Sequence, residues 1–183
     1  MTELETYPAF KKIPRLNREC IVTEKLDGTN GLIHVSEDGV VRAGSRNRWL
    51  TPENDNYGFA KWVQANAEDL AQLGHGFHYG EWWGQGIQRR YGLAEKRFSL
   101  FNVVRWDDPA SRPACCGVVP LLSRDTDIRR ATETALSTLR EKGSIAAPGF
   151  LTPEGIVVYH SASGYLFKVT LENDEQRKGT QET

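Results

Sequence analysis

Alternation between apolar and polar residues predicts that this chain is built mainly from β-strands. Runs typical of strands cover 20–23, 32–35, 39–46, 76–84, 97–104, 118–122, 156–159 and 165–169. Two other stretches have apolar residues at helical spacing: 59–73, which Gly74 ends, and 125–142, which has an aspartate at its start and Gly143 beyond its end. A helix-start signal at 51–53 precedes the first of them. We therefore predict an α+β fold of mainly antiparallel sheets with flanking helices.

The first two predicted strands enclose the stretch Lys25-Leu26-Asp27-Gly28-Thr29-Asn30-Gly31. Asp-Gly and Asn-Gly are turn signals, so the spacing predicts a tight loop that joins the two strands as a β-hairpin. This loop holds an amine, a carboxylate, an amide and two glycines. The residues alone allow two interpretations: an ordinary hairpin with an exposed lysine, or a lysine nucleophile beside a glycine-lined phosphate pocket.

Composition indicates an ordinary globular protein. We expect one domain over 1–183, with a polar, frayed tail at 173–183. The net charge of -1 gives no overall nucleic-acid signal, so any basic surface must be local. The three cysteines form no disulfide framework, which favours a reducing, cytoplasmic setting. Since no apolar run approaches ~20 residues, we expect no membrane contact.

Charged or aromatic residues recur at one kind of place, the end of an apolar run. They are Lys25, Arg46, Glu81, Phe101, Glu154 and Lys168. Each alone has an ordinary explanation, such as a solvated loop tip, a core ring, or an edge-strand lysine that discourages aggregation. Their order along the chain carries more information than any one of them.

In this order, the residues and their neighbours resemble the motifs of a known family. The similar segments are Lys25-Leu26-Asp27-Gly28-Thr29-Asn30 (motif I, KxDGxN), Ser45-Arg46 (motif Ia), Gly80-Glu81-Trp82 (motif III), Phe98-Ser99-Leu100-Phe101-Asn102 (motif IIIa), Pro153-Glu154-Gly155-Ile156-Val157-Val158 (motif IV) and Phe167-Lys168-Val169 (motif V). Over roughly 20–170, the chain resembles the nucleotidyltransferase domain of ATP-dependent polynucleotide ligases, a group that also contains the mRNA capping enzymes. It is most similar to the RNA ligase branch.

The resemblance implies that Lys25 attacks the α-phosphorus of ATP and becomes a lysyl-AMP phosphoramidate. The attacking amine must be neutral; nearby cations, here Lys168 and Arg46, favour that form and suit phosphate oxygens. A divalent ion, Mg²⁺ or Mn²⁺, would neutralise the triphosphate, with Glu154 as its carboxylate ligand. AMP would then pass to a 5′-phosphate end of RNA (or DNA), and a 3′-hydroxyl would displace it to seal the ends or nick.

The resemblance also implies the nucleoside contacts. Glu81 would accept hydrogen bonds from the ribose hydroxyls, and Phe101 would stack on the purine. Glu24 would lie along the adenine edge, chiefly through its main chain, and Asn30 would hydrogen-bond within the nucleotide pocket. Asp27-Gly28 would shape the turn that brings phosphate close.

Separately from these motifs, a basic cluster that includes Arg89 and Arg90, together with Arg48, is either a set of solvated loops or a surface for the phosphate backbone.

Three departures from the family pattern stand out. Asn102 replaces the aspartate that usually ends motif IIIa, and Lys168 is the single lysine where motif V usually has two. No room follows motif V for the OB-fold domain of DNA ligases, which favours the RNA ligase branch and raises the possibility of a partner protein or a second domain in trans. Two alternatives therefore stay open: DNA nick sealing or another nucleotidyl transfer, and a degenerate nucleotide-binding module without ligase activity.

Overall fold

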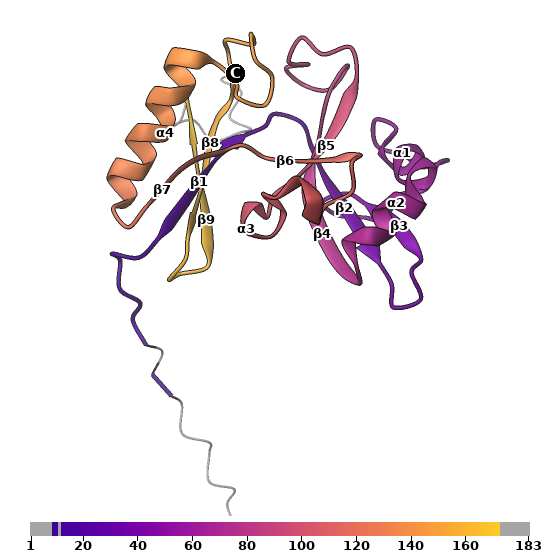
Figure 1. The fold of residues 1–183 in the computed structure, drawn as a ribbon, viewed down its shortest axis with the longest axis horizontal. Coiled ribbons are helices and arrows are strands. Elements are labelled where there is room, and N and C mark those ends of the chain that lie inside the picture. The colour runs from indigo at the N-terminus through magenta and orange to yellow at the C-terminus, as the bar shows by residue number, and fades with distance from the viewer. Residues whose placement is uncertain (1–8, 11, 173–183) are drawn as a thin grey trace, which may run out of the picture.

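The computed structural model describes residues 9–10 and 12–172, which form two β-sheets lying side by side with helices packed against them (Figure 1). Its strands are β1 (Cys20–Lys25), β2 (Thr29–Val35), β3 (Val41–Gly44), β4 (Gly76–Gly84), β5 (Lys96–Leu100), β6 (Cys116–Val118), β7 (Leu121–Asp125), β8 (Gly155–His160) and β9 (Tyr165–Thr170). Its α-helices are α1 (Phe59–Ala65), α2 (Ala67–Leu70), α3 (Val103–Trp106) and α4 (Ile128–Lys142), and short 3₁₀ turns cover Ala71–Leu73 and Pro109–Ser111.

The four-stranded sheet has the order β7-β1-β8-β9, and the five-stranded sheet has the order β3-β2-β4-β5-β6. Every strand pair in the described residues is antiparallel except β5 with β6. This architecture confirms the predicted α+β class with mainly antiparallel sheets. The final strand pair, predicted at 156–159 and 165–169, is also confirmed, as β8 and β9.

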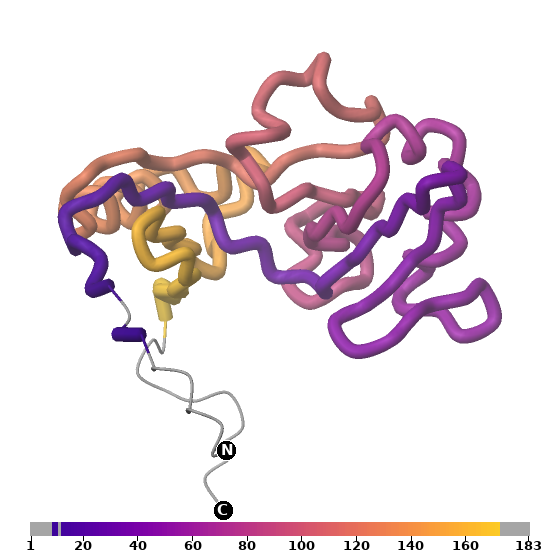
Figure 2. The backbone as a smooth tube through the Cα atoms, turned by 90° about the horizontal axis from the view of Figure 1, so that it is seen from below, coloured from indigo at the N-terminus to yellow at the C-terminus, as the bar shows by residue number. Residues whose placement is uncertain are grey.

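The predicted hairpin around the lysine is wrong. Strand β1 pairs with β7 on one side and with β8 on the other, so it has no edge left for β2. Strand β2 pairs instead with β3 and β4 in the other sheet. The chain therefore crosses from one sheet to the other between Lys25 and Thr29. Figure 2 shows this crossing as the indigo-to-violet stretch of the tube that joins the two halves of the molecule. Asn30 and Gly31 lie inside β2 rather than in a turn.

Two other runs predicted as single strands each contain parts of two elements. The run at 118–122 contains the end of β6 in one sheet and the start of β7 in the other, with Pro120 between them. Proline has no N–H to continue a ladder, which fits a change of sheet at this point. The run at 97–104 stays a strand only as far as Leu100, because Asn102 then caps α3 by accepting the Arg105 N–H at 3.1 Å.

The helices lie close to their predicted positions, but their starts differ. The helical pattern at 59–73 is present as α1, α2 and a 3₁₀ turn, and Gly74 follows with φ of 80°. The predicted start at 51–53 is wrong: the helix begins at Phe59, and the Asp55 carboxylate accepts the Ala60 and Lys61 N–H groups at 2.7 and 3.1 Å. A side-chain acceptor of this kind satisfies the free donors of a first helical turn.

Helix α4 begins at Ile128 rather than at Asp125, because Asp127 is its cap and accepts two backbone N–H groups at 2.9 and 3.2 Å. Gly143 follows the helix, as predicted. Among the described residues, none of the helices combines the length and the apolarity needed to cross a bilayer. The tail predicted to fray, 173–183, lies outside the described residues.

Three clusters of buried side chains hold the layers together. One packs α1 against the five-stranded sheet and includes Ile33 and Phe59. A second packs α4 against the four-stranded sheet and includes Val22 and Ile156. The third, which includes Trp83, joins side chains from both sheets and their connections. The helices thus cover one face of each sheet, and residues on the opposite faces form the candidate site.

Candidate active site

The site is built around Lys25, the last residue of β1. Alternation along a strand places Cys20, Val22 and Glu24 on the face toward α4, which leaves Lys25 on the opposite face. Lys25 lies in register with Gly155 of β8, and Gly155 with Thr170 of β9. The lysine therefore ends a row that crosses three strands.

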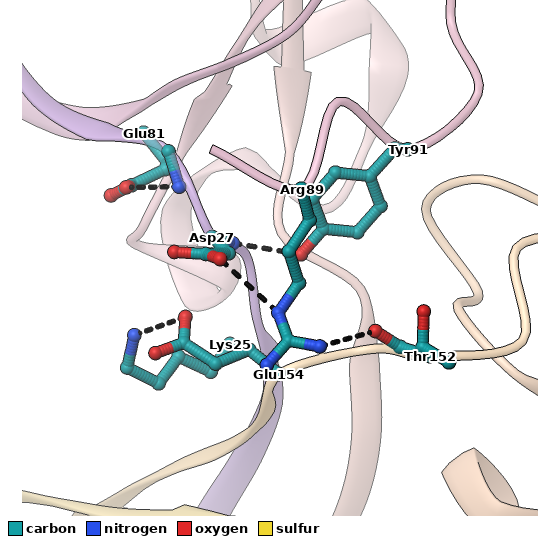
Figure 3. A network of polar contacts seen from close by, with 8 residues as sticks. Lys25, Asp27, Glu81, Arg89, Tyr91, Thr152 and Glu154 are labelled. Carbon is teal, nitrogen blue, oxygen red and sulfur yellow. Dashed lines mark hydrogen bonds and ion pairs between the residues drawn. The ribbon is translucent and has the colours of Figure 1, made fainter. Parts of the chain in front are cut away.

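Lys25 is paired with the carboxylate that precedes β8. Its Nζ lies 2.5 Å from Oε2 of Glu154 (Figure 3), although the two residues are 129 positions apart in the chain. The lysine side chain is 20% exposed and the glutamate side chain 6%. The lysine side chain is thus partly open to solvent, while its partner is almost fully buried.

The segment after Lys25 is held by residues of two other elements (Figure 3). The Asp27 N–H donates to the Tyr91 hydroxyl at 2.7 Å, and the Gly28 N–H donates to Oε1 of Glu81 at 3.0 Å. Arg89 donates from Nε to Oδ2 of Asp27 at 3.1 Å, and from Nη1 to a main-chain carbonyl, that of Thr152, at 2.9 Å. The guanidinium therefore ties the segment after β1 to the segment before β8.

Arg89 and Tyr91 belong to a constrained loop between β4 and β5. Gln88, Arg90 and Tyr91 have positive φ angles of 44°, 60° and 51°, which are uncommon for residues with a side chain. Such conformations persist where the surrounding structure imposes them, and they often do so near functional sites. Burial raises the pKa of the Tyr91 hydroxyl, which keeps this anchor protonated.

Glu81 is a buried carboxyl group close to Lys25. It lies on β4, in register with Asn30 of β2, so both side chains are on the sheet face away from α1. Burial raises the pKa of Glu81 to about 7, while the nearby Lys25 charge and the Gly28 N–H partly oppose that rise. The Glu81 carboxyl group therefore titrates near neutral pH.

Glu24, which precedes Lys25 on β1, is buried on the opposite face of the sheet. Its carboxylate is 1% exposed and accepts the Ser144 hydroxyl at 2.5 Å and the Ile145 and Ala146 N–H groups at 2.8 and 3.0 Å. Burial raises the pKa of Glu24, and these three donors oppose the rise. The side chain thus fastens the segment after α4 to β1, so the predicted nucleotide contact of Glu24 does not use this carboxylate.

Comparisons with known proteins decide the family. The sequence model of the RNA ligase family matches residues 18–170, which is most of the chain. The chain belongs to the RNA ligase family. A comparison with curated protein sequences finds no match.

Solved structures of a Naegleria gruberi RNA ligase have the same fold as this RNA ligase family member. A lysine-to-alanine mutant with ATP and Mn is 20% identical, with a TM-score of 0.56 over 84% of this chain and 50% of that one. An aspartate-to-alanine mutant without ligand is 21% identical, with a TM-score of 0.61 over 84% of this chain and 49% of that one. The ligase with PPi is 22% identical, with a TM-score of 0.58 over 88% of this chain and 53% of that one. This chain therefore spans about half the length of the chains it matches.

The structure brings several predicted site residues of this family member together. Lys25 contacts Glu154, and Gly28 contacts Glu81. Phe101 follows β5, and its N–H donates to the Tyr79 carbonyl at 2.9 Å, which continues the β4–β5 register. Its ring is 39% exposed and lies on the Glu81 face of the sheet.

The two predicted phosphate-binding cations lie further out. Lys168 is exposed on β9, in register with Val157, and so shares the sheet face of Lys25. Strand spacing and rise put their Cα atoms on the order of 12 Å apart, a gap that a triphosphate and two long side chains can bridge. Arg46 is exposed in the loop after β3. The contact that the structure gives Lys25 is an anion, Glu154, rather than the expected cations.

The predicted nucleic-acid arginines divide by their contacts. Arg89 is committed to Asp27 and Thr152, so its observed position is structural. Arg48 donates to the Asn54 and Asp55 carbonyls at 2.9 and 3.3 Å, and Arg90 is exposed. Sequence reasoning missed Tyr91 and Ser144. A tyrosine beside the Arg89-Arg90 pair and a serine just after a helix end are weak signals, because each acts on a partner far away in the chain.

Replacing Gly28 with alanine is expected to damage this site. An added Cβ would lie 2.4 Å from the Trp82 carbonyl oxygen and 2.8 Å from the Trp83 Cβ, so the crossover must move away from β4 and lose the Gly28–Glu81 hydrogen bond. Overpacking of this kind costs about 2 kcal/mol of unfolding free energy, which urea denaturation measures. Gly117→Ala is the control, because its Cβ would meet other atoms only at 3.3 Å or beyond. Equal stability of the two variants would contradict the prediction.

The raised pKa of Glu81 predicts a specific pH dependence of stability. The folded protein holds this proton more tightly than the unfolded chain, whose glutamate has an ordinary pKa of 4.5. The resulting stabilisation is complete below pH 4.5 and is lost as the pH rises to about 7, with a total of about 3 kcal/mol. Urea denaturation at pH 5 and pH 8 should show this loss in the wild type and not in Glu81→Gln. An identical pH dependence in both proteins would contradict the assignment.

Proposed function

We propose that this chain is the nucleotidyltransferase part of an ATP-dependent RNA ligase, with Lys25 as its nucleophile. The observation that carries the proposal is the contact between Lys25 Nζ and the Glu154 carboxylate at 2.5 Å. A lysine at a strand end, with a buried carboxylate beside it and a close glycine crossover after it, can present an amine to a phosphate. Membership of the RNA ligase family supports this reading.

In the first step, neutral Lys25 Nζ attacks the α-phosphorus of ATP. A P–N bond forms, the bond from the α-phosphorus to the bridging oxygen breaks, and pyrophosphate leaves. The amine must first lose its proton, and the Glu154 carboxylate lies within hydrogen-bond distance to accept it. Lys168 and Arg46 supply positive charge for the phosphate oxygens, and Phe101 stacks on the base.

A divalent ion fits the donor set of this site. Within the described part of the chain, no group of three or more His, Cys, Asp or Glu side chains is placed to hold a metal. A site with a single carboxylate, that of Glu154, suits Mg²⁺ or Mn²⁺. These ions often keep several water ligands and bind phosphates together with one or two carboxylates. Glu154 would hold the ion, and when bound it supplies charge neutralisation for the triphosphate. The Naegleria gruberi ligase structures with ATP and Mn are consistent with this pairing.

In the later steps, an oxygen of an RNA 5′-phosphate attacks the lysyl-AMP, and the P–N bond breaks to return free Lys25. The 3′-hydroxyl of a second end then attacks the activated 5′-phosphate, forms the phosphodiester and releases AMP. These steps and the choice of RNA over DNA rest on family membership.

A second candidate is a nucleotide-binding module without ligase activity. Leu166 and Thr170 lie two residues either side of Lys168, so the second lysine of the usual KxK pattern is missing from motif V. Asn102, where an aspartate is usual, caps α3. Both departures remove a charge from the site.

Incubation with α-labelled ATP and Mg²⁺ or Mn²⁺, followed by denaturation, separates the two candidates. The ligase proposal expects label that stays with the protein, is released by acid and resists alkali, as a phosphoramidate does. Unlabelled protein under both metals would favour the inert module. Sealing assays with RNA, DNA and hybrid nicks then identify the substrate.

A further inference from the structure

One face of the five-stranded sheet carries exposed aromatic side chains. Its other face packs on α1 through Ile33 and Phe98. Alternation places the neighbouring residues on the open face, where the rings of Trp49, Phe77, Tyr79 and Phe101 are 52%, 55%, 59% and 39% exposed. We call these four residues and His34 the aromatic face. Large apolar side chains that gather in one exposed patch often mark an interaction site.

The strand register arranges the aromatic face as a continuous surface. Phe101 lies beside Tyr79 through their backbone hydrogen bond, and Phe77 is in register with His34 of β2. The His34 ring lies 4.5 Å from the Phe77 ring and 5.8 Å from the Trp49 ring, measured between centroids. The rings therefore extend from the end of β5 across β4 and β2 to the segment after β3.

This surface is continuous with the nucleotide site. Glu81 is two residues from Tyr79 on β4 and points to the same face, as does Asn30, its register partner on β2. Phe101, proposed to stack on the ATP base, belongs to both. A strand whose end reaches Lys25 would thus pass directly from the reacting phosphate onto the aromatic face.

The charges beside the aromatic face suit a polyanion at one side. Arg42 is exposed and in register with His34, and Arg48 is exposed next to Trp49 in the chain. Acidic Glu37 and Asp38 lie at the β2–β3 connection, beyond the ends of both strands. A polyanion lying along β3 would therefore be next to the arginines, while the carboxylates lie beyond the strand ends.

We propose that the aromatic face binds single-stranded RNA next to the end to be joined, by stacking bases on Tyr79 and Phe77 and contacting phosphates through Arg42. Stacking on exposed rings beside a basic edge is how open sheets hold single strands, since every base has a flat face. This inference rests on the proposed ligase function and adds the surface that holds the polynucleotide.

The test measures binding of a short, 5′-phosphorylated, fluorescent single-stranded RNA by anisotropy. Phe77→Ala and Tyr79→Ala should each weaken binding about tenfold, whereas Phe77→Trp should bind like the wild type. Tyr165→Ala is the matched control, because that ring is 69% exposed on β9 of the other sheet and should not affect binding. Arg42→Gln should reduce the salt dependence of binding.

Lysyl-AMP formation without RNA distinguishes the two proposals. Phe77 lies four residues from Glu81, about 13 Å along the strand, so Phe77→Ala should form the adduct at the wild-type rate. Wild type that forms the adduct but binds no single-stranded RNA, or binds it equally in all variants, overturns the aromatic face alone. Wild type that forms no adduct overturns the ligase proposal. A dimer in sedimentation that Phe77→Ala dissociates would make this face a self-interface and overturn RNA binding there.

Discussion

Replacing Lys25 with alanine is expected to abolish transfer of AMP from α-labelled ATP to the protein. Lys25 Nζ is the amine that the structure places beside Glu154 at the end of β1, and a P–N bond to this amine cannot form without it. Loss of a nucleophile that acts together with its partners removes nearly all of the rate, so the label should fall below detection. The measurement is covalent label after denaturation, at matched protein concentration.

Two controls keep this result interpretable. Lys61→Ala removes an exposed lysine of α1 and should leave the label unchanged. Lys25→Met keeps most of the apolar stem and should fold like the wild type while remaining unlabelled, which separates chemistry from stability. Label that persists in either Lys25 variant would identify another residue as the nucleophile.

Local pattern was sufficient for most of the elements. The β4 strand, the helix α4 and the β8–β9 pair follow from alternation, helical spacing and a polar turn, all of which are short-range signals. Two contacts join residues of different motifs, Lys25 with Glu154 and Gly28 with Glu81, whereas the cations expected beside Lys25, which are Lys168 and Arg46, lie further out. Local spacing could not predict these contacts, because 129 residues separate the first pair.

The wrong hairpin and the divided run at 118–122 share a physical cause, which is that strand partners are chosen by the whole fold. An Asp-Gly signal requires only a change of direction, and both a hairpin and a crossover provide one. The crossover forms instead of the hairpin because β7 and β8 occupy both edges of β1, and because Gly28, which has no Cβ, can approach the β4 backbone. The structural contact of Arg89 with Asp27 depends on the same crossover, so it was equally hidden.

Changing Glu154 to glutamine is expected to slow lysyl-AMP formation about a hundredfold or more, the usual effect of losing a positioned proton acceptor. Glutamine keeps the size of the side chain and an oxygen for Lys25, but it cannot take the proton or hold a divalent ion as a carboxylate does. Because Glu154 is 5% exposed, the packing around it should be retained. The measurement is the single-turnover rate of labelling at saturating ATP and metal.

Glu95→Gln is the matched control, because Glu95 also forms an ion pair, with Arg97 at 2.7 Å, but on the surface and away from Lys25. Exposed pairs of this kind contribute little, so its labelling rate and stability should equal those of the wild type. Glu154→Asp tests the geometry, since it restores the charge at a longer distance and should recover part of the rate. A Glu154→Gln rate within about threefold of wild type would mean that the proton leaves Lys25 by another route, and that the 2.5 Å contact belongs only to the resting enzyme.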